Sequence, residues 1–125
     1  MSKTAEECIA LMLEDIERRK TVEYSDKKSV RAYNAAMDRI YKNGRYINAV
    51  YPEKLYLLIE LLSSKDVKVI LTVATLIQRL PNTTREHRIA SIQAVKKLLS
   101  SDVLDPVEVL GCTWNVEEWE RNLND

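Results

Sequence analysis

The stretch LLSSKDVKVILTVATLIQRLP, residues 61–81, predicts two helices joined by a tight turn. The turn spans Ser63 to Asp66, and the aspartate is available to cap the helix that follows. That helix has an almost continuous apolar series, formed by Val69, Ile70, Val73, Ala74, Leu76, Ile77 and Leu80. Pro81 ends it, because proline lacks an amide hydrogen and clashes with the preceding helical turn. We therefore expect Val73, at the centre of this helix, to be buried on all sides.

The same turn recurs later in the chain. The segment Leu98-Leu99-Ser100-Ser101-Asp102-Val103 repeats residues 61–67 with one residue fewer. Each copy ends an amphipathic helix, turns tightly and begins another helix. Helix pairs of this kind stack on one another in α-solenoids, because a single pair cannot bury its apolar face alone.

The helices on either side are predicted from local start and stop signals. Thr4 and Glu7 have the spacing of a capping box, which predicts the start of a first helix. A second helix is expected to begin near Asp26, and the two N-terminal helices together are expected to cover residues 4–43. Gly44 is expected to end that second helix in a left-handed cap, followed by a loop over residues 45–51. The later boundaries are predicted by Pro52 at a helix start, Thr83 with Glu86 as a capping box, Gly111 at a helix end, and Asn115 with Glu118 at the start of a last helix.

Composition supports a helical protein. The 125 residues include only two glycines and three prolines, whereas sheet proteins need these residues at many tight turns. We expect one all-α domain over residues 1–125 with about six helices. Its core is expected over residues 52–110 and its last helix over residues 115–124.

Residues 61–74 resemble the turn and the short apolar second helix of HEAT-type repeats. The whole layout, including the helix that carries Tyr33-Asn34-Ala35-Ala36-Met37-Asp38, is similar to a family of small bacterial HEAT-like proteins. Several proteins of this kind are similar to immunity proteins, which neutralise secreted toxins of neighbouring bacteria. The resemblance implies a HEAT-like α-solenoid that offers a binding surface.

The net charge of zero conceals a separation of charge along the chain. The segment from Arg18 to Arg45 is rich in lysine and arginine. The end of the chain is acidic, and its acids, opposed only by Arg121, are Asp102, Asp105, Glu108, Glu117, Glu118, Glu120 and Asp125. Clustered charge speeds the encounter with a partner of opposite charge.

The acidic end also contains both tryptophans, and tryptophan is enriched among residues that anchor protein interfaces. The candidate partner-binding residues are Asp102, Asp105, Glu108, Trp114, Glu117 and Glu118. Trp114 is expected to be exposed in a loop beside Gly111, while Trp119 either joins the interface or covers the open end of the core. Because nuclease toxins have cationic substrate grooves, we predict a protein that blocks such a groove.

A second interpretation places the function on the basic stretch of residues 18–51. Tyrosines and cations alternate there, and single-stranded RNA is bound by stacking on aromatic rings and by neutralising phosphates. The tyrosines concerned are Tyr24, Tyr33, Tyr41, Tyr46, Tyr51 and the nearby Tyr56. Alternatively they pack in the core, since the chain has no phenylalanine, and the cations form a solvated helix face.

Catalytic and metal-binding patterns are not found in the sequence. His87 is the only histidine and is expected to face solvent, and no pattern of zinc or di-iron ligands accompanies it. The acids of the first helix, Glu6, Glu7, Glu14, Asp15 and Glu17, are interpreted as a solvated face. We expect no enzymatic activity, no metal and no cofactor.

The expected location is the cytoplasm. No window of the sequence has the apolar run of a membrane span or of a secretory signal, so no membrane association is expected. Cys8 and Cys112 lack the spacing of a metal or redox pair, and we interpret them as reduced residues of the core.

Overall fold

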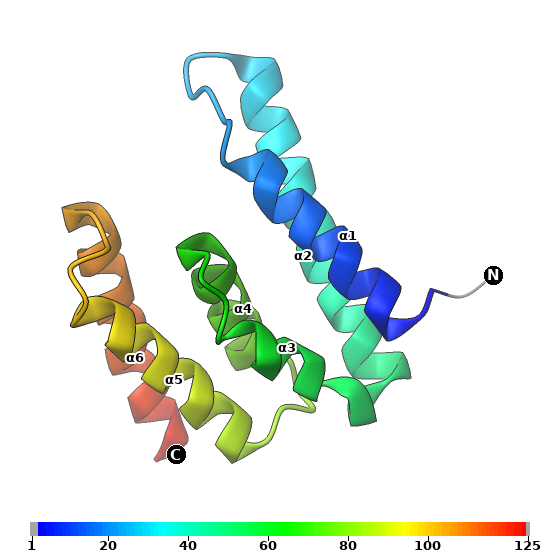
Figure 1. Ribbon diagram of the computed structural model, residues 1–125, viewed down its shortest axis with the longest axis vertical. Helices are drawn as coiled ribbons and strands as arrows, with labels where there is room; N and C mark the ends of the chain where they lie inside the picture. The colour runs from blue at the N-terminus through cyan, green and yellow to red at the C-terminus, as the bar shows by residue number, and fades with distance from the viewer. Residues whose placement is uncertain (1–2, 125) are drawn as a thin grey trace. The chain divides into compact units, whose positions relative to one another are not determined.

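The computed structural model describes residues 3–124, and every regular element in that range is helical. The elements in chain order are α1 (Ala5–Arg19), α2 (Lys27–Val50), the 3-10 helix η1 (Pro52–Lys54), α3 (Tyr56–Leu61), α4 (Val67–Arg79), α5 (Arg85–Leu99) and α6 (Pro106–Leu123), as drawn in Figure 1. The prediction of an all-α fold is therefore confirmed.

The chain divides into two compact units, the first ending at Leu57 and the second beginning at Leu58. This boundary lies inside α3. The predicted N-terminal helices, residues 4–43, thus share a unit with the first residues of the predicted 52–110 core.

The first unit is built on an antiparallel hairpin of α1 and α2 (Figure 1). The predicted capping box begins α1, since the Glu7 amide donates to Thr4 Oγ1 at 3.1 Å and the Thr4 amide donates back to the Glu7 carboxylate. Asp26 caps α2 as expected. The hydrophobic side chains that the two helices bury are Ala5, Cys8, Met12, Ile16, Ala36, Ile40 and Ile47.

The prediction that Gly44 ends the second helix is wrong. Gly44 is buried inside α2, its φ is not positive, and the helix continues through the predicted loop to Val50. A glycine within a helix costs about 1 kcal/mol relative to alanine. Continuing the helix buries Ile47 completely, which contributes about 1.5–3 kcal/mol and so outweighs that cost.

Pro52 begins a helical turn, as predicted, but the turn is the 3-10 helix η1 rather than an α-helix. The α-helix that follows, α3, starts at Tyr56 and has only six residues. Leu55 and Leu58 are buried, as expected for this segment.

In the second unit, α4, α5 and α6 alternate in direction along the chain (Figure 1). The start of α4 follows the prediction, because Asp66 accepts a hydrogen bond from the Lys68 amide at 3.0 Å. The helix ends at Arg79, two residues before Pro81. Val73 is completely buried, so the prediction for the centre of this helix is confirmed.

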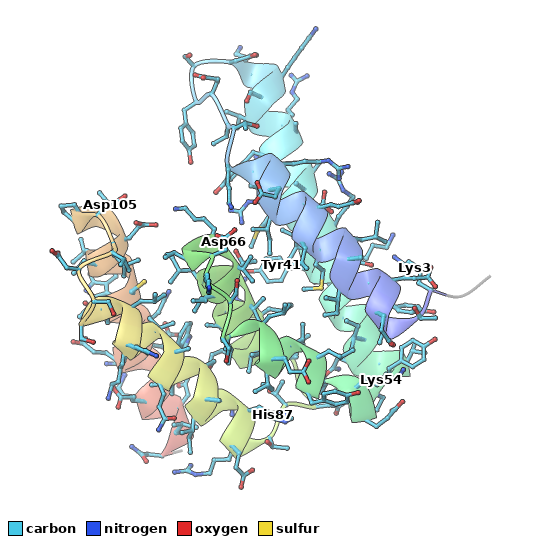
Figure 2. All side chains as sticks on the ribbon, in the orientation of Figure 1. Lys3, Tyr41, Lys54, Asp66, His87 and Asp105 are labelled. Carbon is cyan, nitrogen blue, oxygen red and sulfur yellow. The ribbon has the colours of Figure 1, made fainter. Side chains whose placement is uncertain are left out.

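The capping box of α5 lies one residue later than predicted. Thr83 is buried, and its hydroxyl lies 2.9 Å from the Ile77 carbonyl oxygen and 2.8 Å from that of Leu80. Thr84 caps the helix instead, and His87 Nδ1 accepts a hydrogen bond from the Thr84 amide. Figure 2 shows Asp66, His87 and Asp105 at the N-terminal ends of α4, α5 and α6. The only histidine thus takes a structural role in a helix cap.

The end of the chain is one long helix rather than two short ones. Asp105 caps α6, Pro106 is its first residue, and Gly111 and Asn115 lie inside it. The predicted helix end at Gly111 and the predicted start at Asn115 are therefore wrong. The helix is continuous because Cys112, Val116 and Trp119 repeat at helical spacing and are all buried. Asp102, in the turn before α6, has a left-handed φ of 58°, which aspartate tolerates better than most residues.

Candidate functional site

The inner and outer faces of α6 have different surroundings. Cys112, Val116 and Trp119 form the inner face and belong to a buried cluster with side chains of α4 and α5. Because an α-helix has 3.6 residues per turn, positions 107, 110, 114, 117 and 118 lie on the opposite, outer face. The candidate site is this outer face.

The outer face carries three large apolar side chains in a row. Val107 is 80% exposed, Leu110 60% and Trp114 70%, and their spacing of three and four residues aligns them along the helix. We call this row the outer stripe. Single exposed apolar residues are common on protein surfaces, whereas a contiguous row of them is typical of an interaction site.

Two of the predicted acids continue the outer stripe. Glu117 and Glu118 are exposed on the next turn of α6. Within residues 3–124, neither carboxylate has an ion pair or a hydrogen bond. Both charges are therefore available to a partner that contacts Trp114.

The other predicted acids are placed differently. Asp105 and Glu108 form the capping box of α6, and Glu108 also pairs with Lys68 of α4 at 2.6 Å. Asp102 is exposed in the preceding turn, and Asp125 lies outside the described residues. The structure thus brings Trp114, Glu117 and Glu118 together and gives Asp105 and Glu108 structural roles.

Val107 and Leu110 were not among the predicted site residues. The sequence predicts a helix end at Gly111 and a loop at Trp114, which separates Trp114 from Val107 and Leu110; the predicted loop is wrong, because Trp114 lies inside α6. Once the helix passes through Gly111, all three lie on one face. The signal that identifies them is the helical spacing of Cys112, Val116 and Trp119, which carries the helix that starts at Asp105 through Gly111.

Gly111 itself is exposed in the middle of α6, beside the outer stripe. A Cβ atom built at this position meets no other atom within 4 Å. Packing within the second unit therefore gives no reason for glycine, although glycine weakens a helix by about 1 kcal/mol relative to alanine. A bare backbone on an exposed face allows another chain to approach closely.

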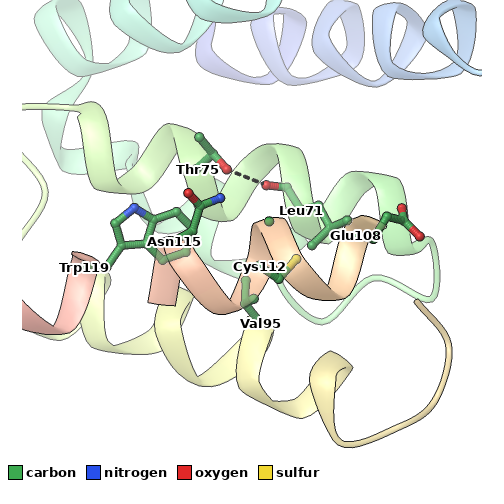
Figure 3. Close-up of a pocket in the computed structure, with 8 residues that line it drawn as sticks. Leu71, Thr75, Val95, Glu108, Cys112, Asn115 and Trp119 are labelled. Atoms are coloured by element: carbon green, nitrogen blue, oxygen red, sulfur yellow. Dashed lines mark hydrogen bonds between the residues drawn. The ribbon is translucent and has the colours of Figure 1, made fainter. Parts of the chain in front are cut away.

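A pocket of about 190 Å³ opens next to Gly111. Figure 3 shows it between the helices, with the Trp119 ring and the Asn115 amide on the side of α6 nearest to Thr75 of α4. Its lining residues are Leu71, Thr75, Val95, Glu108, Gly111, Cys112, Asn115 and Trp119. An apolar cavity of about 150 Å³ accepts benzene, so this pocket has room for one ring or branched side chain.

The two cysteine thiols are buried and free, one in each unit. Burial raises the pKa of the Cys112 thiol, and the neighbouring Glu108 charge raises it further. Burial likewise raises the pKa of the Cys8 thiol. Since the thiolate is the reactive form, both side chains behave as apolar core residues at neutral pH.

Three tyrosines of the basic stretch, Tyr33, Tyr46 and Tyr51, contact other groups of the first unit. The Arg19 guanidinium lies 4.3 Å from the centre of the Tyr33 ring, and Lys3 lies 5.7 Å from that of Tyr46. The Tyr51 hydroxyl donates to the Lys3 carbonyl oxygen at 2.9 Å. Tyr24, by contrast, is 75% exposed.

The interpretation of the acids on α1 as a solvated face is wrong for Asp15. This carboxylate is only 2% exposed, and it accepts hydrogen bonds from Arg39 Nε and Nη2 and from Arg18 Nη1, at 2.8–3.2 Å. Burial alone raises the pKa of Asp15, but the hydrogen bonds and charges of Arg39 and Arg18 outweigh it and lower that pKa below its usual value. The sequence does not show this pairing, because Arg39 lies in the other helix of the hairpin.

This ion pair predicts an acid-sensitive first unit. A carboxyl whose pKa is lowered by folding stabilises the protein above its unfolded pKa, which is about 3.9 for aspartate, and this contribution is lost as the pH falls through the folded pKa. We expect chemical denaturation to show stability falling below about pH 4. The Asp15→Asn variant should be less stable than wild type at pH 7, and the difference should shrink in acid. If Asp15→Asn were less stable than wild type by the same amount at pH 7 and in acid, this role of Asp15 would be contradicted.

Within residues 3–124, no group of three or more histidine, cysteine, aspartate or glutamate side chains is placed to hold a metal ion. None of the helices in this range combines the length and the apolarity needed to cross a membrane. No protein-family model, no curated protein sequence and no solved structure matches this chain.

Proposed function

We propose that this chain is a cytoplasmic protein-binding module of the immunity type, with its second unit built as a HEAT-like stack. In this proposal the outer face of α6 docks into the cationic groove of a basic toxin domain and blocks it. The observation that carries the proposal is the outer stripe of Val107, Leu110 and Trp114, which runs directly into the unpaired acids Glu117 and Glu118.

The chemistry of this face specifies the kind of partner. Apolar anchors such as Trp114 exclude water and supply affinity, while charges at their edge supply specificity and a fast encounter. Two adjacent carboxylates attract a surface rich in lysine and arginine. The substrate groove of a nuclease is such a surface, because it neutralises phosphates, so an acidic face can occupy it in place of nucleic acid. The immunity assignment itself rests on the resemblance of the whole layout, including residues 33–38, to the small bacterial HEAT-like proteins, and on that of residues 61–74 to HEAT-type repeats.

A charge reversal on the outer face tests the electrostatic part of the proposal. The double variant Glu117→Lys with Glu118→Lys should slow association with the partner about tenfold or more at low salt. The effect should fade as the screening length falls from about 30 Å at 0.01 M to about 10 Å at 0.1 M salt. Stopped-flow or biosensor kinetics measure it. The matched control, Glu14→Lys with Asp38→Lys, changes the net charge equally on exposed sites of the first unit and should associate at the wild-type rate.

The partner for this experiment is obtained by affinity capture from lysate, with and without nuclease treatment. We expect nuclease-resistant capture of a basic protein, loss of that protein with Trp114→Ala, and inhibition of its activity by equimolar wild type. Recovery of RNA alone, lost on nuclease treatment, would end the immunity proposal and favour the basic stretch as the working surface.

Gly111 provides a steric test that leaves charge unchanged. A glutamine side chain at this position extends from an exposed site where a Cβ meets no atom of the chain, so Gly111→Gln should fold normally. It should nevertheless weaken partner binding by about tenfold, equivalent to about 1.4 kcal/mol, because it blocks close approach to the helix. Unchanged affinity would place the partner elsewhere on the chain.

A further inference from the structure

A second pocket, independent of the outer face of α6, lies in the first unit near the turn that joins α1 and α2. Its volume is about 170 Å³. Its lining residues are Arg18, Thr21, Val22, Ser29, Ala32, Tyr33 and Arg39. The proposed protein-docking function uses none of them.

The guanidinium groups of this pocket are held in place by the buried carboxylate of Asp15. Arg39 uses Nε and Nη2 to bind it and Arg18 uses Nη1. Each guanidinium has five N–H donors, so both retain donors that Asp15 does not take. The Arg18 and Arg39 side chains are 60% and 49% exposed. One carboxylate against two guanidinium groups leaves the pocket positively charged.

Hydroxyl groups add further donors to the pocket wall. Ser29 Oγ accepts a hydrogen bond from the Glu23 amide at 2.8 Å, and the Tyr33 hydroxyl accepts one from Arg19 Nη2. Each hydroxyl still has its own hydrogen to donate. Arg19 does not line the pocket, but its guanidinium lies over the Tyr33 ring and adds positive charge beside it. The pocket therefore presents guanidinium and hydroxyl donors, and none of its lining residues is an acid, as expected of a site for an anion.

An exposed aromatic ring lies beside this group of donors. The Tyr24 ring centre is 6.1 Å from that of Tyr33, which lines the pocket, and Tyr24 is 75% exposed. Nucleic-acid bases stack on such rings in single-strand binding proteins. The combination of a cationic pocket and a neighbouring free ring matches a ligand that has both a phosphate and a base.

We propose that the pocket of Arg18, Ser29, Tyr33 and Arg39 binds the phosphate of a nucleotide, with the base stacked on Tyr24. A free nucleotide and the 5′-phosphorylated end of an RNA strand both present this chemistry. Asp15 acts as a positioning residue, because it orients the two guanidinium groups and does not contact the ligand.

Calorimetric titration of the full chain tests the site with adenosine monophosphate, adenosine and inorganic phosphate. We expect the nucleotide to bind at least about tenfold more tightly than either fragment, a difference of about 1.4 kcal/mol or more. Tyr24→Ala should reduce nucleotide affinity to that of phosphate. Arg18→Gln should weaken nucleotide and phosphate binding, while Asp15 remains held by Arg39. The control Lys42→Gln removes an exposed cation of α2 outside the pocket and should bind like wild type.

Several outcomes would overturn the proposal. These are equal affinity for adenosine and adenosine monophosphate, equal effects of Arg18→Gln and Lys42→Gln in variants with wild-type melting temperature, or no saturable binding at millimolar nucleotide. Short oligoribonucleotides with and without a 5′-phosphate distinguish the two candidate ligands, a free nucleotide and the 5′-phosphorylated end of an RNA strand. Tighter binding of the phosphorylated strand than of the free nucleotide identifies an RNA end, and the reverse identifies a free nucleotide. Binding of both strands alike, with loss on neutralising Lys27 and Lys28, would replace the pocket by an extended RNA surface.

Discussion

Val73→Asp is expected to abolish cooperative folding of the second unit. Val73 lies in the middle of α4 and is completely buried, and its neighbours Leu76 and Ile77 are also fully buried. A carboxylate placed there has no partner, and burying an unpaired charge costs several kcal/mol. Domains of this size have a total stability of about 5–15 kcal/mol, so the substitution removes most or all of it.

Circular dichroism during thermal and urea unfolding measures this effect. The matched control is Gln93→Asp, which introduces the same charge at an exposed position of α5. The control should change stability by no more than about 0.5 kcal/mol. If Val73→Asp unfolds at the same temperature as Gln93→Asp, α4 is not the core helix of the second unit.

The second large effect separates the two tryptophans. Trp119→Ala should destabilise the protein by about 3–5 kcal/mol, because it removes a large side chain packed in the buried cluster with Ala74, Ile92 and Val95. Trp114→Ala should change stability by no more than about 0.5 kcal/mol, since this side chain is 70% exposed. Urea denaturation of both variants measures the difference.

Trp114, whose replacement should leave stability almost unchanged, is the tryptophan whose replacement should affect partner binding. Trp114→Ala should fold normally and lose affinity for a partner that docks on the outer stripe. Equal stability losses for both variants would show that the two rings share one environment, contrary to the burial of Trp119 alone. A stable Trp114→Ala variant that binds the captured partner with unchanged affinity would remove the outer stripe from the docking surface.

About half of the candidate site was predictable from the sequence. Trp114, Glu117 and Glu118 were identified from charge clustering and residue type, and they lie together on the exposed face of α6. The same reasoning included Asp105 and Glu108, whose carboxylates are occupied by the capping box. Charge counting does not distinguish an acid that caps a helix from one that is available to a partner, because the difference depends on where the helix begins.

The helical class and several boundaries were determined by the sequence alone. The capping box at Thr4, the caps at Asp26 and Asp66, and the helix end before Pro81 all depend on groups within about four residues of one another. The apolar pattern around Val73 likewise identified a buried helix.

Only the tertiary structure decided which residues are buried against other helices. Gly44 and Gly111 could each stand at a helix end or inside a helix. The local free energies of these two placements differ by only about 1 kcal/mol. Burial of Ile47, Val116 and Trp119 against neighbouring helices contributes more than that, so both helices continue. The burial of Asp15 depends in the same way on Arg39 of the opposite helix. Local signals act over one helical turn, whereas burial is set by contacts between helices far apart in the chain.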